Sequence, residues 1–72
     1  MQRPLDVLGS SQDKKVIIEL KSGSRITGTL RAFDSHINIA LEEAGTEDKE
    51  NKIKLGKVLV RGDNIVWVSP EK

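Results

Sequence analysis

The sequence predicts a mainly β domain, in which a short N-terminal helix is followed by a strongly bent, five-stranded antiparallel sheet. The chain has 72 residues, which allows one domain with a thin core. Five stretches rich in Val, Ile and Leu follow one another, most with every second residue apolar, and short turns separate most of them. Short strands at such close spacing are typical of a small bent sheet or open barrel.

The N-terminal part predicts one helix and one strand. We expect a helix over residues 4–11, because Pro4 suits a first helical position and Gly9 suits a helix end. This helix is too short to be stable alone, so it should dock on the rest of the domain. The first strand is expected over residues 15–20, where every second residue of KVIIEL is apolar.

The middle of the chain predicts two more strands, over residues 25–34 and 36–44. Every second residue at the start of the third strand is apolar, as expected for a strand with one buried face. Gly28 lies inside the second strand. A glycine at such a position indicates a sharp bend or the close approach of another backbone segment.

The C-terminal half predicts a charged, mainly acidic loop over residues 45–51 and strands over residues 52–61 and 65–69. The apolar positions of the fourth strand switch from odd to even numbers near Gly56. A bulge or bend at that glycine would explain the switch. The segment GDN forms the turn before the last strand.

The last two strands also predict how the chain gains stability. Their segments VLV and IVWV are apolar on both faces, which is an aggregation hazard at a bare sheet edge. The chain has no Cys for disulfides, so oligomerisation is the remaining way to stabilise so small a core. We expect the fourth and fifth strands to pair with neighbouring subunits, and closed head-to-tail pairing gives a ring.

Two polar segments are the candidate site. In the first segment, alternation in the third strand places His36 and Asn38 on one face, and Asp34 lies two residues before His36. The second segment is RGDN, residues 61–64, at the end of the fourth strand. The planar groups of His36 and Arg61 could stack on a nucleobase, while the Asn38 amide offers a donor and an acceptor to the base edge. Asp34 could orient the Asn or the His. We therefore expect the two segments to meet and bind single-stranded nucleic acid.

Other interpretations are weaker, although a lone His in a strand is most often structural or simply exposed. A hydrolase is disfavoured, because Ser35 and His36 would point to opposite faces of a strand. One His and no Cys argue against a metal site, and we expect no cofactor. RGD is too short to indicate adhesion in a chain without a secretion signal. No apolar run approaches the roughly 20 residues of a membrane helix, and the net charge of +1 indicates no partner by itself.

The arrangement of these segments resembles the Sm and Sm-like family, most closely its archaeal members. LKSGSRITGTLRAFDSHINIAL resembles the first family motif and LVRGDNIVWVS the second. On this resemblance residues 1–72 form a single Sm-like domain, with the first motif at about 15–44, the variable acidic loop at about 45–51 and the second motif at about 52–69. Trp67 stands where a smaller aromatic or aliphatic residue is expected.

The resemblance implies a small open barrel of SH3-like form that assembles into a ring, heptameric in most archaeal cases. It implies binding of uridine-rich single-stranded RNA at the pore, as a scaffold or chaperone without catalytic activity. A cytoplasmic location is expected separately, because the absence of Cys fits a reducing cytosol. By motif match, His36 and Arg61 would enclose the base, Asn38 would contact its edge and Asp34 would hold Asn38, while Gly62 and Asp63 complete the RNA-binding set. The alternative is a structural ring that binds proteins without specific RNA recognition.

Overall fold

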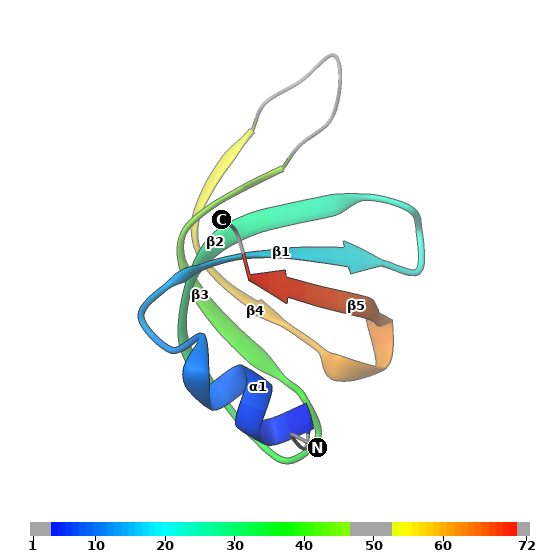
Figure 1. The fold of residues 1–72 in the computed structure, drawn as a ribbon. Helices are drawn as coiled ribbons and strands as arrows, with labels where there is room; N and C mark the ends of the chain where they lie inside the picture. The colour runs from blue at the N-terminus through cyan, green and yellow to red at the C-terminus, as the bar shows by residue number, and fades with distance from the viewer. Residues whose placement is uncertain (1–3, 47–52, 71–72) are drawn as a thin grey trace.

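The computed structural model describes residues 4–46 and 53–70. One helix and five strands follow in order (Figure 1): α1 Pro4–Ser10, β1 Lys15–Leu20, β2 Arg25–Phe33, β3 Ile39–Thr46, β4 Lys54–Val60 and β5 Ile65–Pro70. A short 3-10 helix, η1, spans Gly62–Asn64 and joins the last two strands. Within the described residues, no helix is long and apolar enough to cross a membrane.

The five strands form one antiparallel sheet in the order β4-β3-β2-β1-β5. The edge strands β4 and β5 are thus neighbours in sequence, joined only by Arg61 and η1. So short a connection between opposite edges requires the sheet to curl strongly, as Figure 1 shows. The predicted fold class is therefore confirmed.

Two glycines allow the sheet to bend. A Cβ atom at Gly28 would lie 3.2 Å from the Ala44 Cα atom and 3.2 Å from the Glu42 carbonyl oxygen, so the predicted close backbone approach is confirmed. Gly56 has a φ of 72°. Gly56 pairs with Ala44, and the register shifts on both sides of this pair. β4 contains one extra residue between Lys54 and Gly56, which accounts for the predicted switch of its apolar phase, and β3 contains one extra residue between Leu41 and Ala44.

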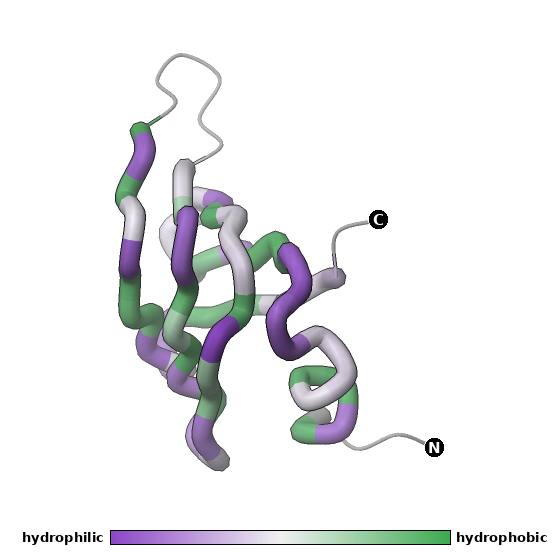
Figure 2. The backbone as a smooth tube through the Cα atoms, turned by 90° about the vertical axis from the view of Figure 1, so that its left-hand side faces the viewer, coloured by the Kyte–Doolittle hydropathy of each residue, from purple (hydrophilic) through white to green (hydrophobic). Residues whose placement is uncertain are grey.

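The core lies on the inner face of the curled sheet. Hydrophobic and hydrophilic residues alternate along much of the strands (Figure 2). The largest fully buried side chains are Val16, Ile18, Leu30, Ile39 and Leu41. Helix α1 contributes Leu8, which is 5% exposed, to the same cluster, so the helix docks as expected. Each such side chain contributes roughly 1.5–3 kcal/mol through burial.

The third strand differs most from its prediction. It begins at Ile39 and not at residue 36, and it continues through Gly45 and Thr46, which were expected in the acidic loop. The rest of that loop, residues 47–51, lies outside the described residues. Ile37 has a φ of 62°, in the left-handed region and outside the extended range of a regular strand. The alternation argument for residues 36–38 is therefore wrong, because these residues form a loop.

The other boundaries differ by one or two residues. The helix ends at residue 10 instead of 11, β2 ends at residue 33 instead of 34, and β5 extends to residue 70 instead of 69. Strand β4 spans residues 54–60, so Arg61 lies in the turn, and residue 52 is outside the described part of the chain.

Candidate nucleic-acid interface

The loop between β2 and β3 is organised by the side chain of Asp34. Its Oδ1 atom accepts hydrogen bonds from the backbone N–H groups of His36 at 2.9 Å and Asn38 at 3.1 Å. The backbone N–H of Ile37 donates to the Asp34 carbonyl at 3.0 Å. These bonds hold the chain in a tight turn and hold Ile37 at its positive φ, a conformation that is costly for a β-branched residue.

The side chain of Asn38 joins this loop to the turn after β4. Its Nδ2 atom donates to Asp34 Oδ2 at 3.0 Å, and its Oδ1 atom accepts the backbone N–H of Gly62 at 2.9 Å. A carboxylate can only accept and a backbone N–H can only donate, so these two partners fix which way the amide faces. The orientation of Asn38 is therefore set before any ligand arrives.

Gly62 lies directly against the loop. A Cβ atom at this position would collide with the His36 carbonyl oxygen and would lie 2.9 Å from the carbonyl carbon of Ile37. Both obstacles are backbone atoms, which cannot rotate away. Only glycine therefore allows the turn to approach the loop closely enough for the bond to Asn38.

The two segments enclose a polar hollow of about 450 Å³, lined by His36, Asn38, Arg61, Gly62 and Asp63. The guanidinium of Arg61 pairs with the Asp63 carboxylate at 3.4 Å, and both side chains are mostly exposed. His36 is exposed as well. Two planar, exposed side chains thus border one hollow with an oriented amide, a combination able to accept a flat polar ligand such as a nucleobase.

The charge of Asp34 is stabilised by the same contacts. The hydrogen bond from the Asn38 side chain lowers the pKa of Asp34 below its usual value of 3.8, and the backbone N–H groups of Asn38 and His36 act in the same direction. Desolvation opposes this shift. Asp34 is therefore a carboxylate at neutral pH, which its role as a hydrogen-bond acceptor requires.

The predicted meeting of the two polar segments thus occurs, although through a loop and not a strand face. Five of the six predicted residues line the hollow, and Asp34 holds two of them in place from behind. Ile37 was missed as a contributor to the site, because a β-branched residue gives no local signal for a positive φ. Among the described residues, no group of three or more His, Cys, Asp or Glu side chains could hold a metal ion.

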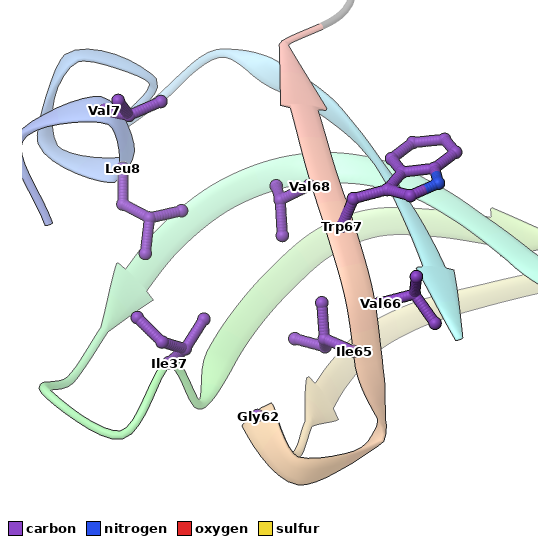
Figure 3. A pocket seen from close by; sticks show the side chains of 8 residues that line it. All are labelled: Val7, Leu8, Ile37, Gly62, Ile65, Val66, Trp67 and Val68. Atoms are coloured by element: carbon purple, nitrogen blue, oxygen red, sulfur yellow. The ribbon is translucent and has the colours of Figure 1, made fainter. Parts of the chain in front are cut away.

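A second, apolar hollow of about 380 Å³ lies beside the edge strand β5. Figure 3 shows Leu8 of α1 and Ile37 of the loop on one side, with Ile65 and Val68 of β5 facing them. The indole of Trp67 projects away from these four side chains. An open apolar surface at a sheet edge is a suitable contact for another subunit.

Comparison with known proteins finds the same domain along nearly the whole chain. The family model described as LSM domain matches residues 6–70. The Sm-like protein of Thermococcus sibiricus is 43% identical over 70 residues, covering 96% of this chain and 92% of the relative. The Sm-like protein of Methanococcoides burtonii is 44% identical over 70 residues, covering 94% of this chain and 96% of the relative.

Solved structures agree with these matches. The P. aerophilum SmAP1 heptamer superimposes with a TM-score of 0.93 at 35% identity, covering 100% of this chain and 97% of that one. The Pyrococcus abyssii Sm protein in complex with a uridine heptamer gives a TM-score of 0.90 at 39% identity, covering 97% of this chain and 100% of that one.

Proposed function

We propose that this chain, which belongs to the LSM domain family, assembles into a ring that binds uridine-rich single-stranded RNA at its pore. The observation that carries the proposal is the hollow in which His36, Asn38 and Arg61 meet. The related P. abyssii protein has been solved with a uridine heptamer, which supports the same ligand class here. In this proposal the chain is a cytoplasmic RNA scaffold or chaperone and not an enzyme.

Assembly is supported by the two free edges of the sheet. Strands β4 and β5 each have one neighbour within the chain, so their outer backbone groups can pair with another copy. Both edges carry exposed apolar side chains: Leu59 of β4 is 70% exposed and Val66 of β5 is 56% exposed. Pairing β4 of one subunit with β5 of the next would cover both, and the opposite positions of the edges suit a closed ring. The heptameric P. aerophilum relative makes seven subunits the expected number.

Base selection is supported by the state of the Asn38 amide. Asp34 takes one Nδ2 hydrogen, and Gly62 donates to Oδ1. Among the described residues, no partner takes the second Nδ2 hydrogen, so it can donate to a ligand in the hollow. Uracil presents the carbonyl oxygen O4 as an acceptor, whereas cytosine presents an amino donor at the same position. A fixed donor therefore favours uracil, while His36 and Arg61 stack on either base.

The test is equilibrium binding of oligo-uridine and oligo-cytidine at one moderate salt concentration, with ring size followed by native mass spectrometry. We expect tight binding of oligo-uridine and much weaker binding of oligo-cytidine. Asn38→Ala should reduce this preference more than it reduces overall affinity, and Lys14→Ala, which removes an exposed cation outside the hollow, is the control. Equal affinity for both oligonucleotides would contradict the proposal.

A second candidate function is a structural ring that binds proteins, in which the residues of the polar hollow play no part. The exposed apolar edges of the sheet also support this function. The double variant His36→Ala, Arg61→Ala separates the two. If RNA binding is the function, the ring persists and oligo-uridine binding is lost. If the structural function is correct, the variant still captures the natural partner.

A further inference from the structure

Three consecutive residues of the binding loop face two different hollows. His36 and Asn38 line the polar hollow, whereas Ile37, which lies between them, lines the apolar hollow together with Leu8 of α1. Figure 3 shows the side chains of Leu8 and Ile37 on the same side of the apolar hollow, opposite β5. The two groups that would contact a base are therefore joined through a residue whose side chain packs elsewhere.

The backbone of Ile37 is unusual for its residue type. Among the described residues, three non-glycine residues have a positive φ, namely Asp13, Ile37 and Glu43, and Ile37 is the only β-branched one. Such a conformation persists only where the surroundings favour it. The hydrogen bonds of the loop would favour it equally for Asn or Gly, which adopt a positive φ more easily. What Ile37 adds is an apolar side chain, partly buried against the core.

Gly62 connects the two hollows, because it lines both of them. A Cβ atom at Gly62 would lie 2.9 Å from the carbonyl carbon of Ile37, and its N–H donates to Asn38 Oδ1 at 2.9 Å. A shift of Ile37 in the apolar hollow would therefore move the backbone that carries His36 and Asn38 and would change its contact with Gly62. The geometry of the polar hollow thus depends on packing in the apolar one.

From this arrangement we propose that Ile37 is a positioning residue, whose side chain, packed beside Leu8 in the apolar hollow, holds His36 and Asn38 in the geometry that binds a base. The inference rests on the proposed RNA-binding function and deepens it, because Ile37 sets base affinity without lining the polar hollow. A β-branched side chain suits this role, since its restricted rotamers transmit its packing to the backbone. In the proposed ring the next subunit would pair with β5 beside the apolar hollow, which would bury Ile37 further.

The first test is the binding of uridine monophosphate, which occupies one pocket and so excludes avidity. Ile37→Asn keeps a residue that tolerates a positive φ but removes the apolar side chain. We expect it to weaken binding by about five- to 30-fold, the factor for ordering one freed backbone residue. Ile37→Val, which keeps a branched apolar side chain, should retain most of the affinity. If Ile37→Asn binds as tightly as the wild type, the hydrogen bonds of the loop alone set its geometry and the inference is wrong.

Leu8→Ala tests the same role from outside the loop. Leu8 lines the apolar hollow but not the polar one, so a loss of uridine monophosphate affinity would have to pass through Ile37. Val16→Ala is the matched control, because Val16 is fully buried in the core and lines neither hollow; it should lose stability and keep its affinity. The double variant Leu8→Ala, Ile37→Asn should lose no more affinity than Ile37→Asn alone. Wild-type affinity in Leu8→Ala, or an equal loss in Val16→Ala, would make Ile37 an ordinary core residue.

Amide hydrogen exchange, followed by NMR, tests the positioning without RNA. The Gly62 N–H bonds to Asn38 Oδ1, so its protection reports whether the loop and the turn stay in contact. In Ile37→Asn it should exchange faster relative to the amide of Ile18, which is paired on both sides in β1, while Val16→Ala should leave this ratio unchanged. Native mass spectrometry of each variant distinguishes loss of assembly from loss of positioning.

The two proposals can fail separately. Absence of uridine binding by the wild type would remove the proposed function. An unchanged exchange ratio in Ile37→Asn would remove only the positioning role of Ile37 and leave the proposed function standing.

Discussion

Gly62→Ala tests the proposal that close backbone contact assembles the polar hollow. The added Cβ atom would collide with the His36 carbonyl oxygen and lie 2.9 Å from the Ile37 carbonyl carbon. The turn must therefore move away from the loop. That movement breaks the 2.9 Å hydrogen bond from the Gly62 N–H to the Asn38 amide, so one methyl group should disturb both halves of the site.

The expected cost follows from two losses. Forcing an extra methyl group into a packed site costs about 1–3 kcal/mol, and a lost hydrogen bond adds about 1 kcal/mol. The free energy of unfolding should therefore fall by about 2–4 kcal/mol, a large part of the 5–15 kcal/mol typical of a folded domain. Oligo-uridine affinity should fall as well, because Asn38 loses one of the two partners that orient it.

The assay is urea unfolding at one protein concentration, since oligomers gain stability with concentration. Gly9→Ala is the matched control. Gly9 is exposed in α1, and the nearest atom to its added Cβ would be the Phe33 Cζ atom at 4.0 Å. Alanine favours the helix by roughly 0.5–1 kcal/mol, so this variant should be no less stable than the wild type. If Gly62→Ala unfolds at the same urea concentration as the wild type, the close-contact argument is wrong.

Three further predictions address the charge of the loop, the ring edge and the stacking group. Folding lowers the pKa of Asp34, so the Asp34 carboxylate stabilises the folded chain above the usual pKa of 3.8, and this stabilisation is lost as pH falls through the lower pKa of the folded state. Urea unfolding across acidic pH should show this loss in the wild type and not in Asp34→Asn. Leu59→Lys places a charge on a side chain that is 70% exposed in the single chain and that ring assembly would cover. Native mass spectrometry should therefore detect smaller, folded species. A ring of unchanged size would place the interface elsewhere. Arg61→Lys keeps the charge but loses the planar group, so oligo-uridine affinity should fall while its salt dependence stays, and unchanged affinity would exclude stacking by Arg61.

The strands were predictable because their signals are local. One-sided burial requires a period of two, which is visible in β1 and at the start of β2 and β3. The bends at Gly28 and Gly56 were predictable because each glycine interrupts an apolar pattern that would otherwise continue. The order of the strands in the sheet was harder to predict from the sequence, because strand pairing depends on contacts between distant residues.

The shape of the binding loop was not predictable from local pattern. Apolar alternation continues through Ile37 into β3, so it suggested a strand where the chain forms a turn. What bends the chain is the Asp34 carboxylate, together with the approach of Gly62 from 24 residues beyond Asn38.

The most direct measurement is a crystal structure of the chain with a short oligo-uridine. We predict a closed ring joined through β4 and β5, with a uracil ring between His36 and Arg61 and its O4 atom within hydrogen-bond distance of Asn38 Nδ2. A ring with uridine bound elsewhere, or a uracil whose edge faces away from Asn38, would contradict the proposed mechanism of recognition.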